Sequence, residues 1–284
     1  MRLSVSNKTV YSILLVSFFY LIGCTKAQSP ISVSQSLPEI KKSEIEKIKN
    51  EAKVIHVLVA LCDNENQGIV PVPAHLGNGE DAGRNLYWGA AYGVKTFFTK
   101  SGNWQKLDEI KNPKENILER LIFKHKAENV YLIADAYRGS KIKETIVDFL
   151  SAISGEKLEN IEINKLQFQI SGSANLIAFI GHNGLMDFNL EISSFQKDEE
   201  KRDAVILACA SKNYFAKHLK KTSAKPLLWT TNLMAPEAYI LHDALEGWVK
   251  GESEKEIQVR AASAYAKYQK ISQRAAENLL VTGW

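Results

Sequence analysis

Five short runs of apolar, largely β-branched residues recur along the chain and constrain its fold more than any other feature. Nearly continuous runs of this length are typical of strands buried on both faces of a parallel sheet. The runs cover residues 54–61, 129–134, 175–180, 204–208 and 227–230. Helical patterns lie between and after them, at residues 85–98, 141–150, 212–221, 236–249 and 254–278. This alternation predicts an α/β fold, a three-layer sandwich with a mostly parallel central sheet.

The rest of the chain fits one folded domain. Charged residues make up 24% and hydrophobic residues 45% of the 284 residues, which excludes a disordered chain, a collagen-like chain and a multi-span membrane protein. No internal repeat or long linker interrupts residues 38–284, so we expect a single domain there. Ser36 and Glu39 have the spacing of a capping box at the start of its first helix. Residues 161–170 alternate in part between apolar and polar side chains, which allows an added edge strand.

Residues 1–23 resemble a bacterial export signal. Arg2 and Lys8 supply positive charge, and the apolar run over 10–22 is shorter than the roughly 20 residues that cross a bilayer. The run ends in Leu-Ile-Gly-Cys, which resembles the lipobox of lipoproteins, where a signal peptidase cuts before the Cys and the thiol receives lipid. The alternative is an ordinary secretory signal peptide in which Cys24 is incidental.

The lipobox resemblance implies a lipoprotein of the cell envelope, attached to a membrane through lipid on Cys24. Residues 24–37 are rich in Ser and Gln and are expected to form a tether. Thr25 stands where Asp would retain a lipoprotein in the inner membrane, so the outer membrane is favoured. Whether the protein faces the periplasm or the cell surface stays open.

Two reactive side chains follow consecutive predicted strands, at the sheet edge where α/β proteins place their ligand sites. His182 comes soon after one strand and Cys209 directly after the next. If these strands are neighbours, their ends lie about 5 Å apart, so the imidazole and the thiol can cooperate. A helical pattern begins near Ser211, and a helix N-terminus favours a thiolate. Cys209 is therefore the candidate nucleophile and His182 the candidate general base or acid.

Groups around this pair are candidates for oxyanion stabilisation and substrate binding. The backbone N–H groups of Asn183, Gly184 and Cys209 are the candidate oxyanion donors. Polar side chains at the strand ends and in the loops are candidate substrate contacts, although each is also explained as a loop charge or a cap. They are Arg84 and Arg138 for an acidic side chain, Asp63, Asp135 and Asp187 for a basic one, and Asn64 and Ser211 beside them.

The order of a strand, a His-containing Gly turn, a strand, Ala-Cys-Ala-Ser and a helix resembles the caspase–hemoglobinase superfamily of cysteine peptidases. This superfamily includes caspases, legumains, clostripains and gingipains, and the resemblance covers residues 54–232. It implies a caspase-like topology, a His–Cys dyad, a peptide or protein substrate, and no metal or cofactor. In the family's strand order one strand separates those that end at Cys62 and Cys209. Two strand spacings, about 10 Å, are too far for a disulfide, so Cys62 is expected to be a packing residue.

Two functions stay open at this point. One is a lipid-anchored cysteine peptidase that cleaves peptide bonds through a thioester. The other is a non-catalytic lipoprotein that binds a peptide or another envelope partner with the same loops, because Asn183 and Lys212 depart from the family pattern around the His and the Cys. The net charge of +4 without a Lys/Arg run argues against nucleic acid as a partner. No phosphate-binding loop or His/Cys metal spacing is present, so neither a cofactor nor a metal is expected.

Overall fold

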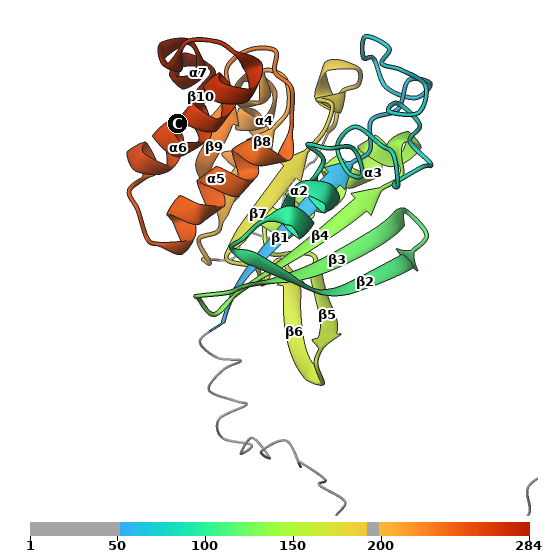
Figure 1. The fold of residues 1–284 in the computed structure, drawn as a ribbon, viewed down its shortest axis with the longest axis vertical. Helices are drawn as coiled ribbons and strands as arrows, with labels where there is room; N and C mark the ends of the chain where they lie inside the picture. Colours follow the sequence, from blue (N-terminus) through green and yellow to red (C-terminus); the bar gives the residue numbers. More distant parts are fainter. Residues whose placement is uncertain (1–51, 192–198) are drawn as a thin grey trace, which may run out of the picture. The chain divides into compact units, whose positions relative to one another are not determined.

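A central sheet of eight strands, in the order β10-β9-β8-β7-β1-β4-β3-β2, organises the protein (Figure 1). The computed structural model describes residues 52–191 and 199–284. Five neighbouring strands of the sheet are parallel and correspond to the five apolar runs, which confirms an α/β sandwich with a mostly parallel sheet. These strands are β1 (Lys53–Ala60), β4 (Val130–Tyr137), β7 (Leu176–Ile180), β8 (Asp203–Leu207) and β9 (Lys225–Thr230).

β1 lies in the middle of the sheet, hydrogen-bonded to β4 on one side and β7 on the other. Seven of its eight residues are buried, and only Lys53 at its start is exposed. A strand covered on both faces needs side chains that are apolar, or polar and paired inside the protein, at every position, and this is the reason the run over 54–61 lacks the alternation of a half-exposed strand.

Three further strands form antiparallel pairs with their neighbours, and the sequence did not predict them. β2 (Trp104–Lys114) and β3 (Ile117–His125) form a hairpin beside β4, and the short β10 (Leu280–Val281) pairs with β9. β2 is an edge strand with a largely exposed, charged sequence. β3 is mostly buried but contains Glu119 and Arg120, which interrupt its apolar pattern. Both strands therefore lack the continuous apolar run that identified the five parallel strands in the sequence.

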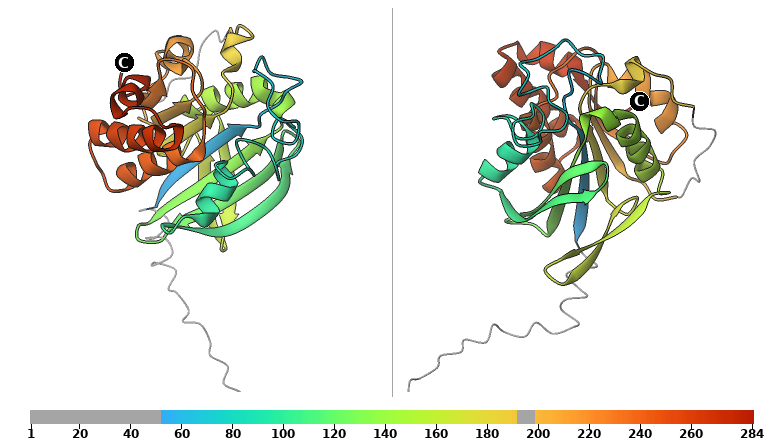
Figure 2. Two further views of the ribbon diagram at one scale, coloured as in Figure 1. Left: turned by 45° about the horizontal axis from the view of Figure 1, so that its top comes forward. Right: turned by 90° about the vertical axis from the view of Figure 1, so that its right-hand side faces the viewer.

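Helices cover both faces of the sheet (Figure 2). On one face lie α2 (Val94–Lys100), α5 (Ala238–Val249) and α6 (Glu254–Gln269), with α7 (Gln273–Leu279) beside α6. On the other lie α3 (Ile142–Ile153) and α4 (Ser211–Leu219), together with a hairpin of β5 (Leu158–Ile163) and β6 (Leu166–Ser171). Two short 3-10 turns, η1 (Gly139–Lys141) and η2 (Gly184–Met186), complete the elements.

Three sequence predictions about elements are corrected. The helix expected over 85–98 begins only at Val94, because residues 85–93 form turns. The helix expected over 254–278 is broken at Lys270, which adopts a left-handed conformation. The possible edge strand at 161–170 is instead a hairpin that forms its own two-stranded sheet. The capping box at Ser36 lies outside the described residues.

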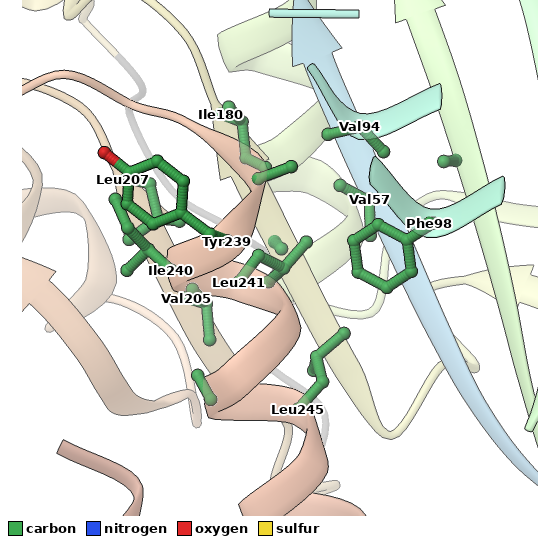
Figure 3. Packing of buried hydrophobic residues seen from close by; sticks show 14 of the residues in the cluster. Val57, Val94, Phe98, Ile180, Val205, Leu207, Tyr239, Ile240, Leu241 and Leu245 are labelled. Atoms are coloured by element: carbon green, nitrogen blue, oxygen red, sulfur yellow. The ribbon is translucent and has the colours of Figure 1, made fainter. Parts of the chain in front are cut away.

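The core packs helix α5 against the parallel strands (Figure 3). Leu241 and Leu245 of α5 belong to the same buried cluster as Val57 of β1 and Val205 of β8. Each is almost completely buried, and burial of an aliphatic side chain contributes about 1.5–3 kcal/mol. This packing fixes the strands whose carboxyl ends form the candidate site. No helix in residues 52–191 or 199–284 is long and apolar enough to cross a membrane.

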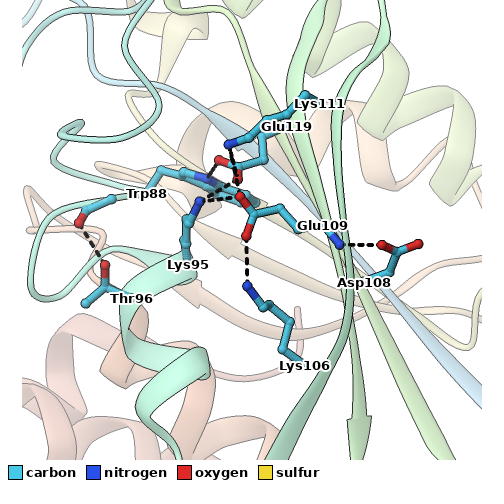
Figure 4. Close-up of polar contacts among 9 residues, drawn as sticks. Trp88, Lys95, Thr96, Lys106, Asp108, Glu109, Lys111 and Glu119 are labelled. Atoms are coloured by element: carbon cyan, nitrogen blue, oxygen red, sulfur yellow. Dashed lines mark hydrogen bonds and ion pairs between the residues drawn. The ribbon is translucent and has the colours of Figure 1, made fainter.

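A polar network fixes the hairpin edge of the sheet (Figure 4). The buried carboxylate of Glu119 on β3 accepts hydrogen bonds from the Trp88 indole at 2.7 Å and from Lys95 and Lys111 at 2.5 and 2.7 Å. Because these partners neutralise the charge, Glu119 can occupy an interior position. The network joins α2 and the segment before it to β2 and β3.

Candidate active site

His182 and Cys209 lie at the carboxyl ends of adjacent strands. β7 and β8 are parallel neighbours, and their last residues, Ile180 and Leu207, are paired in register. The chain then turns at Gly181, which has a φ of +150°, and a Cβ at this position would lie only 2.8 Å from the Ala60 carbonyl oxygen. Only glycine fits this close approach to β1. The strand adjacency predicted from the sequence is therefore present, and it brings the two reactive residues to one edge of the sheet.

Both residues line one pocket with a volume of about 320 Å³. The side chain of His182 is 7% exposed, and Cys209 is partly exposed with a free thiol. No hydrogen bond joins the His182 ring to the Cys209 sulfur within the described residues. Catalytic hydrogen bonds are often long in the absence of substrate, so the shared pocket is the relevant observation. The walls are Gly68, Ile69, Val70, Tyr87, Gly181, His182, Met186, Cys209, Leu233, Met234 and Pro236.

His182 is oriented by a carboxylate. Its Nε2 lies 2.7 Å from Oδ2 of Asp187, and the same oxygen accepts the N–H of Gly68 at 3.0 Å. A ring nitrogen held by a carboxylate leaves Nδ1 as the one for proton exchange with a thiol or substrate. The sequence assigned Asp187 to substrate binding. The Gly turn is visible in the sequence, but its consequence, that residue 187 comes back over residue 182, was missed.

Cys209 lies in a sharp strand-to-helix turn. Ala210, directly after it, has φ 46° and ψ 35° and forms the N-cap of α4. A left-handed conformation costs a non-glycine residue roughly 1 kcal/mol or more, and such strain is common at functional sites. The Cys209 sulfur lies 3.4 Å from the Met234 N–H and 3.5 Å from the Met234 carbonyl oxygen. A thiolate at this position would accept a hydrogen bond from the Met234 N–H and would lie just before the first turn of α4, and both favour its negative charge.

The candidate oxyanion donors differ in availability. The backbone N–H of Gly184 donates to the His182 carbonyl at 3.1 Å, within its own turn. The Asn183 side chain ties the two loops together, since its Nδ2 donates to the Cys209 carbonyl at 2.6 Å and its Oδ1 accepts from Leu185. The backbone N–H groups of Asn183 and Cys209 have no hydrogen-bond partner in the described part of the chain. Both are therefore free to stabilise an oxyanion.

Most of the other predicted substrate contacts have structural roles outside the pocket. Asp63 accepts the N–H groups of two following residues at 2.9 and 3.1 Å and so caps a loop turn. Asn64 pairs with the backbone of Val72 at 2.8 and 3.0 Å. Ser211 is fully buried and hydrogen-bonds to the Ile206 carbonyl and to Thr230. None of the three lines the pocket.

The two arginines proposed for acidic substrates are held by neighbouring acids. Arg84 forms an exposed ion pair with Asp81 at 2.8 Å. Arg138 pairs with Glu80 and donates to the Glu115 carbonyl at 2.8 Å. Neither arginine is a wall of the pocket.

Asp135 lies inside the protein. β4 continues to Tyr137, so Asp135 belongs to the strand and not to the loop after it, and its side chain is completely buried. Arg120 binds both carboxylate oxygens at 2.6 and 2.7 Å, and the His56 ring lies 3.0 Å away. Burial alone raises the pKa of a carboxyl group, but here the hydrogen bonds from Arg120 and His56 outweigh it and lower the pKa of Asp135 to about 2.

Cys62 is buried and free, and it lies two strands away from the strand that precedes Cys209. Burial raises the pKa of its thiol to about 11, because the opposing hydrogen bond with Tyr87 is the smaller effect. Its backbone is held by the Asn85 side chain at 3.0 and 2.8 Å. These features are those of a packing residue and not of a nucleophile.

The described residues contain no group of three His, Cys, Asp or Glu side chains that could hold a metal ion. Cys24 lies outside the described residues. Comparisons with protein-family models, with curated proteins and with solved structures found no match to the chain.

Proposed function

We propose that the protein is a cysteine peptidase of the caspase–hemoglobinase type, with Cys209 as nucleophile and His182 as general acid and base. One observation carries the proposal. Cys209 and a carboxylate-paired His182 share an open pocket at the carboxyl ends of two adjacent parallel strands. The order of the parallel strands, with the first between the second and the third and the fourth beyond the third, supports a caspase-like topology.

The reaction follows from these groups. The Cys209 thiolate attacks the scissile carbonyl carbon, and the carbonyl oxygen takes negative charge beside the Cys209 N–H. The C–N bond breaks as the His182 imidazolium gives its proton to the leaving amine. Water then attacks the thioester while His182 accepts a proton from it, and the carboxylic acid product leaves Cys209 free again.

Asp187 acts in this proposal as a positioning residue. We expect Asp187→Asn to lower kcat on the order of 10²-fold with little change in KM, because the amide loses the charge that stabilises an imidazolium. Asn retains an oxygen for the Gly68 N–H, so the loop should keep its place. Steady-state hydrolysis of a fluorogenic peptide measures both constants. Asp81→Asn, in an exposed ion pair outside the pocket, is the control, and an unchanged kcat for Asp187→Asn contradicts this role.

The proposal includes anchorage through lipid on Cys24, with the cell envelope as the location. Cys24→Ala is expected to abolish lipid incorporation in expressing bacteria and to move the protein from the membrane fraction to the soluble fraction. Metabolic labelling with a fatty acid and fractionation measure the two effects. Retention of Cys24→Ala in the membrane fraction with lipid still attached would refute lipidation at this residue.

A non-catalytic peptide-binding protein is the second candidate. It is favoured by the absence of a His182–Cys209 hydrogen bond within the described residues and by the use of the Gly184 N–H inside its own turn. Peptide binding by calorimetry without hydrolysis, and without labelling of Cys209 by electrophilic peptides, supports this candidate over the peptidase.

A further inference from the structure

The pocket that contains Cys209 has apolar walls. Apart from Cys209, His182 and two glycines, its lining consists of aliphatic, thioether, aromatic and proline side chains, and no Asp, Glu, Lys or Arg lines it. A charged substrate side chain that entered it would lose hydration without meeting an opposite charge. A large apolar side chain would gain free energy from the same burial. The chemistry of the walls therefore selects against charge.

Apolar side chains are also exposed at the rim of this pocket. Val70 is 87% exposed, Leu233 67% and Met186 42%. They belong to a group of seven large exposed hydrophobic residues in residues 52–191 and 199–284. Single exposed apolar residues are ordinary, but three around one opening form a patch of the kind that marks a binding site. They come from the loop after β1, the turn after β7 and the segment after β9, so the fold gathers them at the site.

The charged groups near this end of the sheet are already paired. Arg84 and Arg138 have carboxylate partners outside the pocket, and Asp63 caps its own loop. Asp187 is paired with the pocket residue His182, and its Oδ2 is held by the His182 ring and by the Gly68 N–H. None of these charged groups lines the pocket, so none of them offers an opposite charge to a substrate side chain inside it.

We infer that this pocket takes a large apolar side chain, of the Leu, Met or Phe kind, from the residue that supplies the scissile carbonyl. The inference rests on the proposed peptidase function. The acyl part of the substrate is the part bonded to the Cys209 sulfur, and the pocket wall at Met234 lies 3.4–3.5 Å from that sulfur. A volume of about 320 Å³ is at the lower end of ligand pockets, roughly 300–1,000 Å³, and suits one side chain.

The test compares peptide acyloxymethyl ketones that differ only in the residue next to the ketone, which is Leu, Phe, Asp or Arg. We expect the Leu and Phe probes to inactivate the full chain about tenfold or more faster than the Asp and Arg probes. Faster reaction of the Asp or Arg probe at Cys209 overturns the inference and leaves the peptidase proposal intact. No reaction of any probe at Cys209, together with no peptide hydrolysis, overturns the peptidase proposal and the inference with it.

A pair of variants tests the rim directly. Leu233→Asp places a carboxylate at the opening and is expected to raise the Arg-to-Leu ratio of inactivation rates about tenfold. Its side chain is 67% exposed, so the change should not affect folding. Leu158→Asp is the matched control, because Leu158 is 61% exposed on β5, outside the pocket. An unchanged ratio in Leu233→Asp, or an equal change in Leu158→Asp, contradicts the assignment of this pocket.

Discussion

Cys209→Ala is expected to lower kcat/KM for peptide hydrolysis by about 10⁴-fold or more and to abolish covalent incorporation of an acyloxymethyl ketone. The thioester cannot form without the sulfur, and the small change of side chain leaves the turn at Ala210 in place. Total incorporation per chain, measured by intact-protein mass spectrometry, gives the result in one experiment. His182→Ala should retain the thiol yet lose most of the incorporation rate, because the group that exchanges protons with it is gone.

Cys62→Ala is the matched control for this experiment. The Cys62 thiol is buried, and with a pKa of about 11 only about one part in 10³ is thiolate at pH 8. We therefore expect Cys62→Ala to hydrolyse peptides and to react with the probe as the parent protein does. If Cys209→Ala incorporates the probe as well as the parent does, Cys209 is not the reactive thiol and the proposed mechanism is wrong.

Arg120→Met is expected to lower the free energy of unfolding by about 3–5 kcal/mol at pH 7. The arginine binds both oxygens of the completely buried Asp135 and also Glu159 at 2.7 Å. Its removal leaves a carboxylate in the interior with His56 as its one remaining hydrogen-bond partner among the described residues. Urea unfolding monitored by circular dichroism measures the loss. Arg84→Met removes an arginine from an exposed ion pair, with 69% of its side chain exposed, and should change stability by no more than about 0.5 kcal/mol.

The stability that the Arg120–Asp135 pair contributes should change with pH in a definite direction. The pKa of Asp135 is lowered from 3.8 to about 2 in the folded protein, so its contribution to stability is full above about pH 4 and is lost as the pH falls toward 2. In Arg120→Met the hydrogen bonds from Arg120 that lower the pKa of Asp135 are lost, while its burial, which raises the pKa, remains. The pKa of Asp135 therefore rises, and its carboxyl group takes up a proton at higher pH. The stability difference between parent and variant should therefore shrink from pH 7 to pH 4. A difference that grows over this range contradicts the assignment.

The sequence predicted the parts of the fold that depend on continuous apolar character. A strand such as β1, buried on both faces, shows its burial in its own residues, and the adjacency of β7 and β8 followed from their order along the chain. The hairpin of β2 and β3 escaped prediction because Glu119 and Arg120 are tolerated inside only through partners supplied by other segments. The pattern of residues within one strand does not show which residues from other segments will pair with its buried charges.

The candidate site divides in the same way. The placement of His182 and Cys209 at one edge of the sheet followed from the position of each after its strand, whereas Asp187, the partner of His182, was assigned to substrate binding. The roles of Asp135 and Asp187 depend on which side chains meet in space, and Asp135 meets His56 from 79 residues away. The apolar walls of the pocket come from three separate loops, so no single stretch of sequence displays them.

The position of β1 determines at which end the domain can be attached to a surface without covering the pocket. The chain enters the described domain just before Lys53, and the pocket lies beyond the opposite end of the same eight-residue strand, roughly 26 Å away at 3.3 Å per residue. An attachment point next to Lys53 therefore lies at the end of the domain remote from Cys209. Immobilisation on a bead or a sensor chip through such a point should leave the pocket mouth accessible, which makes capture at this end of β1 the suitable format for measuring the binding of large peptides or whole proteins.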